Sequence, residues 1–518
     1  MAQSLFDLRP TKPAGLVEFP DKIVVGYQYF KSSNLTSPTR INLHLLTPTD
    51  VNVKWSEFKQ CACAPGSQIA LGSLIQCRNF AGTITYNPNL NSEFQMMYGF
   101  ENTTFIAGFK SGMQRFIVNN DTLKVGAILG VNSNQEYIGA LTKITNTDFL
   151  SIINDTYYDK VYSSYRDYCD GIELKNIHNY KQGINNGTGG FLAKTSSSVF
   201  MYFTYHGNGF KVQKYSISSQ SITDLVSSSR GNYHTAQPSN FFEKASTNTQ
   251  KIFYVARVIG TNQFVVEKYT LDLNAEKCTK EDCTINGNPD VFLSVSESRF
   301  SSKCWVMYDS SNDKYYLNVM FFARFDYNPD ISNFRLYTFE LDPTNPSNLT
   351  FVTQYNFTQQ PGGFLYLNND KTKIVVTGMS DCEVLSFQDK WTSLRLGTGS
   401  VKVCIYDNYG RLWVLNELNE VFMLLPQLPA QIIIKPKDTE LEYTGSTITT
   451  KVYISAYNYE GKRVAVNGTL KILSDNAEFQ DGSKVKSVTT SSTNDVEVDI
   501  NITGPGILTI AFDVDYTL

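Results

Sequence analysis

The chain has 518 residues, with 45 basic and 49 acidic side chains and a formal net charge of −4. This length exceeds what one hydrophobic core usually supports, so we expect two or more domains or a large closed repeat. The balanced charge offers no basic surface for nucleic acid, and no window approaches the roughly 18 apolar residues of a membrane helix, so we expect neither nucleic-acid binding nor membrane insertion.

The first 22 residues are expected to form an extended arm. Pro10, Pro13 and Pro20 interrupt regular structure there, and Asp7 and Arg9 stand where a secretory signal needs its apolar stretch. A disordered tail is normally poor in apolar side chains, yet this segment carries several. They predict an arm that docks on its own body or on another subunit through Leu5, Phe6, Leu8, Leu16 and Phe19.

Residues 23–425 consist of short apolar or alternating runs that end in Asn, Asp, Gly and Ser turns. Without long helical patterns between them, these runs predict an all-β body. The segments KYTLD (268–272) and YTFELD (337–342) close two units in the same way, with a looser match at KYSIS (214–218). A period of about 40 to 50 residues with four strands is typical of a β-propeller blade, which predicts about seven blades, within a range of six to eight. A pair of long β-sandwiches is the alternative.

One hairpin near the end of this body carries a resemblance. Asp407-Asn-Tyr-Gly410-Arg-Leu412-Trp413-Val414 resembles the D-x-x-G-x-L-W-V hairpin in blades of several propeller families. Asp407 and Gly410 suit the turn, and the strand from Leu412 to Val414 is expected to be buried between neighbouring blades. After it, Pro426 and Pro429 stiffen a short connector.

Residues 431–518 predict a separate β-sandwich. Ile448, Thr450, Val452, Ile454 and Ala456 alternate with polar or larger residues, as do Val496, Val498, Ile500 and Ile502, which is the pattern of strands with one face inward. About seven short strands in this length fit an immunoglobulin-like fold. The order of an early TGSTI, a central YEGKRV turn and a late TGPGILTI strand resembles the bacterial Ig-like modules of adhesins and phage tail proteins.

The sequence offers few metal ligands. The nine cysteines include two local groups, Cys61, Cys63 and Cys77, and Cys278 and Cys283, but no histidine completes a structural zinc site beside them. Free buried thiols, or one disulfide between neighbours, are the better interpretation. Asp513 and Asp515 do not complete a calcium cage, which needs six or more oxygens. We therefore expect no metal and no other cofactor.

No catalytic motif of the common hydrolase, nucleotide-binding or metalloprotease types occurs. His206 and His234 are expected to be ordinary turn or loop residues. Asp167, Asp170 and Glu173 are carboxylates that a glycosidase would need as a pair, but any surface of this size has such residues. The sequence therefore predicts a protein that is not an enzyme.

A β-repeat body, an Ig-like module and an apolar arm together resemble the structural proteins of tailed bacteriophages, in tail, nozzle or spike. The resemblance implies a virion protein that is made and assembled in the host cytoplasm. Its expected partners are other virion proteins and copies of itself, with a host surface glycan or receptor as a further expectation. The alternative is a cell-surface or periplasmic adhesin of propeller and Ig-like type that binds glycan or protein, and a polysaccharide-degrading enzyme is the third class.

Overall fold

The computed structural model describes the following residues: 14–18, 23–29, 40–46, 74–77, 82–86, 94–101, 104–109, 112–119, 122–130, 136–143, 149–155, 159–163, 188–205, 209–228, 235–260, 263–290, 300–323, 335–357, 361–367, 371–378, 382–395, 401–406, 412–416, 421–424, 431–458 and 462–514. All regular elements among them are β-strands. The predicted all-β class is therefore confirmed.

Ten sheets form in the described residues, and we number them along the chain. Sheets 1 to 4 cover the N-terminal half of the body. Sheet 1 contains β1 (Ala14–Glu18), β2 (Ile23–Tyr29), β3 (Arg40–Leu46) and β5 (Gly82–Tyr86). Sheet 2 contains β6 (Phe94–Glu101), β7 (Thr104–Phe109), β8 (Gly112–Asn119) and β9 (Thr122–Gly130). Sheet 3 contains β10 (Glu136–Lys143), β11 (Phe149–Asp155) and β12 (Asp159–Ser163), and sheet 4 contains β13 (Thr188–Lys194), β14 (Ser198–Tyr205), β15 (Gly209–Ser216) and β16 (Ser221–Ser228).

Sheets 5 to 8 complete the body. Sheet 5 contains β18 (Gln250–Gly260), β19 (Gln263–Asp272) and β20 (Lys277–Asp282). Sheet 6 contains β17 (Thr235–Gln237), β22 (Phe300–Asp309), β23 (Lys314–Ala323), β24 (Arg335–Asp342), β25 (Asn345–Asn356) and β21 (Thr284–Asn286), in that order. Sheet 7 contains β26 (Pro361–Leu367), β27 (Lys373–Gly378), β28 (Cys382–Gln388) and β29 (Lys390–Arg395). Sheet 8 contains β30 (Val401–Tyr406), β31 (Leu412–Asn416), β32 (Val421–Leu424) and β4 (Leu74–Cys77).

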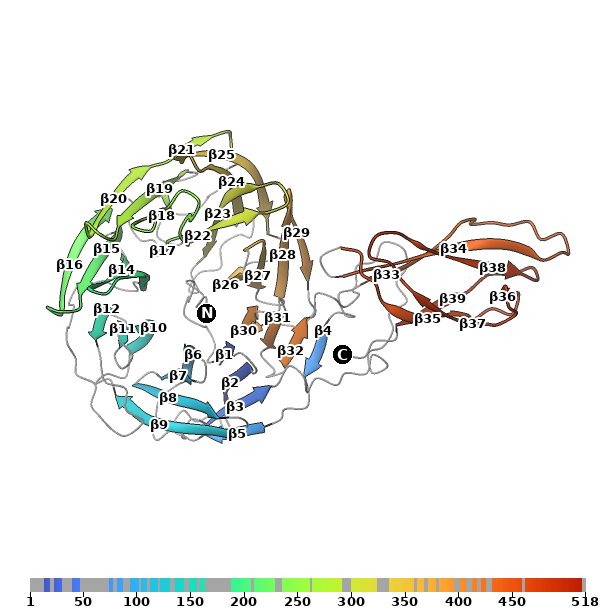
Figure 1. Cartoon of the computed structure of the whole chain (residues 1–518), viewed down its shortest axis with the longest axis horizontal. Helices are drawn as coiled ribbons and strands as arrows, with labels where there is room; N and C mark the ends of the chain where they lie inside the picture. The colour runs from blue at the N-terminus through green and yellow to red at the C-terminus, as the bar shows by residue number, and fades with distance from the viewer. Residues whose placement is uncertain are drawn as a thin grey trace.

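These eight sheets lie around a ring in chain order (Figure 1). Consecutive sheets are in contact, mostly through their first strands and, between sheets 4 and 5, through the last strands β16 and β20. The series returns to its start because β30 of sheet 8 lies against β1 of sheet 1. The sequence predicts about seven such units, and the described residues hold eight. Sheet 1 is built from β1, β2, β3 and β5, while β4, which lies between β3 and β5 in sequence, joins sheet 8.

Sheet 8 closes the ring with a strand from the other end of the chain. β30, β31 and β32 follow one another in sequence, but the outer strand is β4, which pairs antiparallel with β32 from Leu74↔Leu424 to Cys77↔Val421. All of β31 is buried, including Trp413. The prediction of a buried strand at residues 412–414 is therefore confirmed.

The cores lie between sheets, because the middle strands bury both faces. On β23, Leu317, Val319 and Phe321 pack in the cluster shared with sheet 5. Tyr316 and Met320, on the opposite face of the same strand, pack in the cluster shared with sheet 7. Successive side chains of a strand point to opposite faces, so a nearly continuous apolar run serves two cores at once.

The repeated Leu-Asp ending has a structural reason. The segments 268–272 and 337–342 end β19 and β24, each the strand before the last turn of its unit. The Asp272 carboxylate accepts hydrogen bonds from the backbone N–H groups of Asn274 and Ala275, at 3.0 and 2.8 Å. The Asp342 carboxylate accepts one from the N–H of Thr344 at 2.8 Å. The aspartate therefore fixes the turn that follows it.

Several turns hold a non-glycine residue in the left-handed backbone region. Gln220 ends the β15–β16 turn with φ of 54°, a conformation that disfavours residues with a Cβ. Gln220→Gly is expected to raise the free energy of unfolding by about 0.5–1 kcal/mol, since relief of this strain exceeds the added entropy of the unfolded chain. Chemical denaturation would measure the gain. Gln220→Ala is the control, and an equal gain from it would contradict the strain argument.

Residues 431–514 form the last two sheets. Sheet 9 contains β33 (Gln431–Pro436), β34 (Ile448–Tyr457), β38 (Val496–Ile502) and β36 (Ala477–Phe479), and sheet 10 contains β37 (Val485–Thr489), β35 (Asn467–Ile472) and β39 (Ile510–Val514). One core joins them, with Val452, Ile454 and Ile500 from sheet 9 packed against Leu470 and Ile472 from sheet 10. The predicted alternation on both strands of sheet 9 is confirmed. We call this two-sheet unit the C-terminal module, and in Figure 1 it projects from the ring.

Candidate functional surfaces

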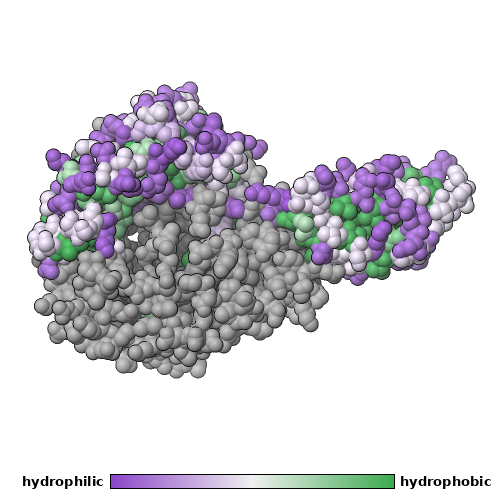
Figure 2. All heavy atoms as spheres, in the orientation of Figure 1, coloured by the Kyte–Doolittle hydropathy of each residue, from purple (hydrophilic) through white to green (hydrophobic). Residues whose placement is uncertain are grey.

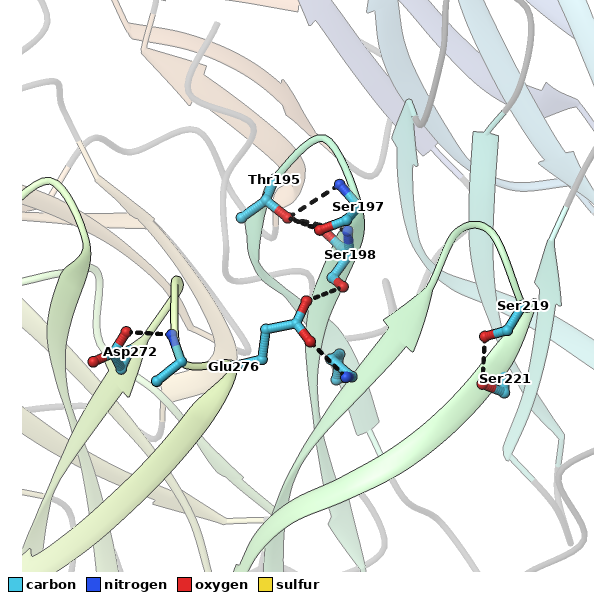
Figure 3. Close-up of polar contacts among 9 residues, drawn as sticks. Thr195, Ser197, Ser198, Ser219, Ser221, Asp272 and Glu276 are labelled. Carbon is cyan, nitrogen blue, oxygen red and sulfur yellow. Dashed lines mark hydrogen bonds and ion pairs between the residues drawn. The ribbon is translucent and has the colours of Figure 1, made fainter.

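Hairpin turns of neighbouring sheets gather on one side of the ring, which we call the turn face. Glu276, in the β19–β20 turn of sheet 5, accepts a hydrogen bond from Ser198 of sheet 4 at 2.6 Å and pairs with Lys214 at 2.7 Å. Figure 3 shows Glu276 beside Ser198 and the Thr195–Ser197 turn, with the Ser219–Ser221 turn nearby. The hydrogen bond from Lys214, then that from Ser198, lowers the pKa of Glu276, so the carboxylate stays charged.

The same side continues over sheets 6 and 7. Asn312, in the β22–β23 turn, donates through Nδ2 to Asp389 in the β28–β29 turn at 3.2 Å, and also to Asp309 at 2.8 Å. Asp309 in turn accepts a hydrogen bond from the N–H of Ser311 at 3.0 Å. On the turn face, short polar turns therefore join sheet 4 to sheet 5 and sheet 6 to sheet 7.

One exposed aromatic ring stands among these turns. Tyr308, next to last on β22, is 40% exposed and stacks on Tyr315 of β23 with ring centroids 4.6 Å apart. Its hydroxyl donates to Asp313 at 2.9 Å, and this bond is the first cause that raises the pKa of Tyr308. Tyr315 packs against Phe242, in the segment between β17 and β18, with ring centroids 5.3 Å apart. The exposed ring is thus supported from below and fixed at its tip.

A second surface lies at the end of the C-terminal module far from the connector. β33 runs away from Gln431, and the loops at its far end are joined by the hydrogen bond from the N–H of Leu473 to the carbonyl of Thr509, at 2.8 Å. Four of the large exposed apolar side chains of the described residues belong to this end: Leu441 (40%), Leu473 (61%), Val485 (54%) and Ile507 (86%). Figure 2 shows the module as a separate lobe with apolar surface among hydrophilic residues. We call these four residues the apolar end.

A buried charged network joins sheets 4 and 5. Glu267 of β19 is fully buried and accepts hydrogen bonds from Ser228 at 2.7 Å and Tyr269 at 2.8 Å. Arg257 forms an ion pair with it at 3.4 Å, and Lys280 forms another at 3.6 Å. Burial, followed by the charge of Glu267, raises the pKa of Tyr269, so its hydroxyl remains a donor. All of these hydrogen bonds and ion pairs stabilise the buried Glu267 carboxylate, so we assign the network a structural role.

The structure places few of the residues singled out in the sequence. Leu16 lies on β1, between Pro13 and Pro20, where a five-residue strand pairs with β2 in sheet 1. The other predicted arm residues, Leu5, Phe6, Leu8 and Phe19, lie outside the described residues, so the docking arm stays a prediction. The same holds for His206, His234, Asp167, Asp170, Glu173 and Asp515. Asp513 forms an ion pair with Lys471.

The cysteines that the structure describes with side chains are free thiols: Cys278, Cys283, Cys304 and Cys404. Burial raises the pKa of Cys278 and of Cys304 to about 12, so these thiols stay protonated and unreactive. Within the described residues, no three or more His, Cys, Asp or Glu side chains group as metal ligands. The same part of the chain has no helix long and apolar enough to cross a membrane.

Sequence reasoning did not identify Tyr308 or the apolar end. Tyr308 ends the apolar run of residues 304–308, in which every residue before it is buried, so only its place next to the turn distinguishes it. Ile507 follows Gly504-Pro-Gly506 and reads as the first residue of a strand, whereas the strand begins at Ile510. The position of Ile507 directly after a glycine-rich turn is the sequence feature that could have indicated its exposure.

Neither a protein-family profile nor a curated protein matches this sequence. Among solved structures, BamB from Moraxella catarrhalis is similar with a TM-score of 0.42 and 10% identity, over 80% of this chain and 95% of that one. A chain of the yeast Nup82-Nup159-Nup116 nucleoporin complex gives 0.39 and 10%, over 64% and 96%. A protein from Lactobacillus plantarum gives 0.39 and 10%, over 70% and 94%.

Proposed function

We propose that this chain is a non-enzymatic structural protein of a virus particle, of the kind found in the tails or vertices of tailed bacteriophages. In this proposal residues 23–425, together with β1, form a β-propeller body of eight blades, residues 431–518 form an Ig-like module, and the rest of residues 1–22 forms a docking arm. The protein is made and assembled in the host cytoplasm, and its partners are other virion proteins and copies of itself.

The apolar end of the C-terminal module is the observation that carries this proposal. Leu473, Val485 and Ile507 are more than half exposed, and large side chains of this kind stabilise a protein when a partner removes them from water. Their place, at the end of a module that projects from the ring, suits attachment to a neighbouring subunit. A specific interface needs about 1,000 Å² or more of buried surface, so we expect further module residues to take part.

Peptide mass spectrometry on particles banded in a density gradient tests the proposal. Peptides of this chain should band at a fixed ratio with DNA-filled capsids. Finding them only with cell envelopes would reject the virion role and favour the alternative, a surface adhesin of the same architecture.

The contact itself is tested with Ile507→Asp, which places a charge in the expected interface. In particles made with this variant, the amount of the chain per capsid should fall at least tenfold. Val352→Asp, which puts the same charge on a 39% exposed residue of the ring, is the matched control and should be incorporated normally. Equal incorporation of both variants would show that the apolar end is not the attachment surface.

A further inference from the structure

One edge of β22 is covered by β17 and the residues that follow it, but this cover ends before β22 reaches the turn face. Asn240, three residues after β17, holds the backbone of Val306 with two hydrogen bonds: its Nδ2 donates to the Val306 carbonyl at 3.2 Å, and its Oδ1 accepts from the Val306 N–H at 2.9 Å. The chain then turns away, since Phe242 bonds to Ile252 of sheet 5. Tyr308, two residues further along β22, is left partly open to solvent.

The ring of Tyr308 is held in one orientation. Tyr315 covers one face, with 28° between the ring planes, and Phe242 supports Tyr315 from the core. The hydrogen bond from the Tyr308 hydroxyl to Asp313 fixes the ring tip at 2.9 Å. A ligand that stacks on the exposed part of this ring therefore loses little affinity to the entropy cost of ordering the Tyr308 side chain.

A fixed acceptor lies at the tip of this ring. Asp313 holds the hydroxyl with one oxygen and has lone pairs beyond this contact. The nearest described cation on the same turn, Lys314, is paired with Glu340 at 2.9 Å, and the described residues there do not group as metal ligands.

We propose that Tyr308 is the stacking platform of a binding site for a neutral saccharide ring. A hexose has a flat face of C–H groups that matches an aromatic face, and its hydroxyls donate to carboxylates, which form stronger hydrogen bonds than neutral acceptors. The Asp313 carboxylate beside the platform repels sugars that carry an acid group. The site lies on the ring of sheets, remote in sequence from the apolar end of the C-terminal module. It therefore adds a recognition role to the proposed assembly role.

Saturation-transfer NMR on the full chain tests this site with methyl glycosides of glucose, galactose, mannose and N-acetylglucosamine. At least one of them should receive saturation, and titration calorimetry with that sugar should give a dissociation constant that Tyr308→Ala raises tenfold or more. Tyr308→Phe keeps the stacking face and should stay within about threefold of the unaltered protein. Val352→Ala, at an equally exposed position on β25 of the same sheet, should leave binding unchanged.

Three results would overturn the proposal: no saturation of any neutral glycoside, equal affinity of Tyr308→Ala and the unaltered chain, or binding only of glucuronate or sialic acid. Thermal unfolding of Tyr308→Ala should match that of the unaltered chain, which separates lost binding from lost folding. The particle experiment has an independent readout, so failure of the saccharide site leaves the assembly role to be judged by the gradient.

Discussion

Glu267→Ala is expected to lower the free energy of unfolding by about 3–5 kcal/mol, because it leaves Arg257 as a buried charge without its balancing carboxylate. Arg257 and Glu267 are both almost fully shielded from water. The substitution also removes the acceptor of the Ser228 and Tyr269 hydroxyls, and buried donors without an acceptor are costly. Urea denaturation followed by circular dichroism measures the loss.

Two further variants separate charge from packing in this network. Glu267→Gln keeps the shape and part of the hydrogen bonding, so we expect a smaller loss of about 1–3 kcal/mol. Lys280→Ala removes a partly exposed partner at 3.6 Å and should change stability by no more than about 1 kcal/mol. A loss for Lys280→Ala as large as that for Glu267→Ala would contradict the central place of the Arg257–Glu267 pair.

Trp305→Ala is expected to cost about 3–5 kcal/mol through loss of apolar burial and the cavity that remains. The indole is fully buried between sheets 6 and 7, edge to face with Trp391 at a centroid distance of 6.3 Å. Its neighbours Leu336, Ile374 and Leu385 come from both sheets, so neither sheet alone can close the gap. Denaturant unfolding with intrinsic fluorescence gives the change in stability.

Trp305→Phe is the matched control for this position. The indole Nε1 is buried and has no hydrogen-bond partner, so the phenyl ring keeps most of the apolar contact and loses no polar bond. We expect a cost of about 1–2 kcal/mol. Tyr308→Ala, three residues along the same strand but exposed, should cost less than about 1 kcal/mol. Equal losses for the two alanine variants would mean that the core between sheets 6 and 7 is not packed as described.

Local patterns in the sequence predicted what depends on a few neighbouring residues. The alternation from Ile448 to Ala456 places Val452 and Ile454 in the core, because side-chain direction along a strand has a period of two. The Leu-Asp endings predicted units, because Asp272 and Asp342 cap their own turns. Such features need no knowledge of the distant chain.

Features that depend on distant segments were not predictable in this way. Sheet 6 has two extra strands: β17, which precedes the strands of sheet 5 in sequence, and β21, which follows them. They pair parallel with β22 and β25, respectively. The exposure of Tyr308 depends on where Asn240 ends its contact with β22. The residues near β17, β21 and Tyr308 in sequence do not predict these features. Parallel strands are joined by long crossovers, and Asn240 lies 66 residues before Val306.

The pairing of β4 with β32 ties folding to the order of synthesis. The segment Leu74–Cys77 leaves the ribosome early, and its partner Val421–Leu424 emerges only after the rest of the ring has been made. Until then, sheet 8 lacks its outer strand and β4 has an open edge, which is a site for wrong pairing with another chain. Once formed, this pairing joins an N-terminal segment to the last sheet of the ring, so sheet 8 cannot separate from residues 74–77 without first breaking it.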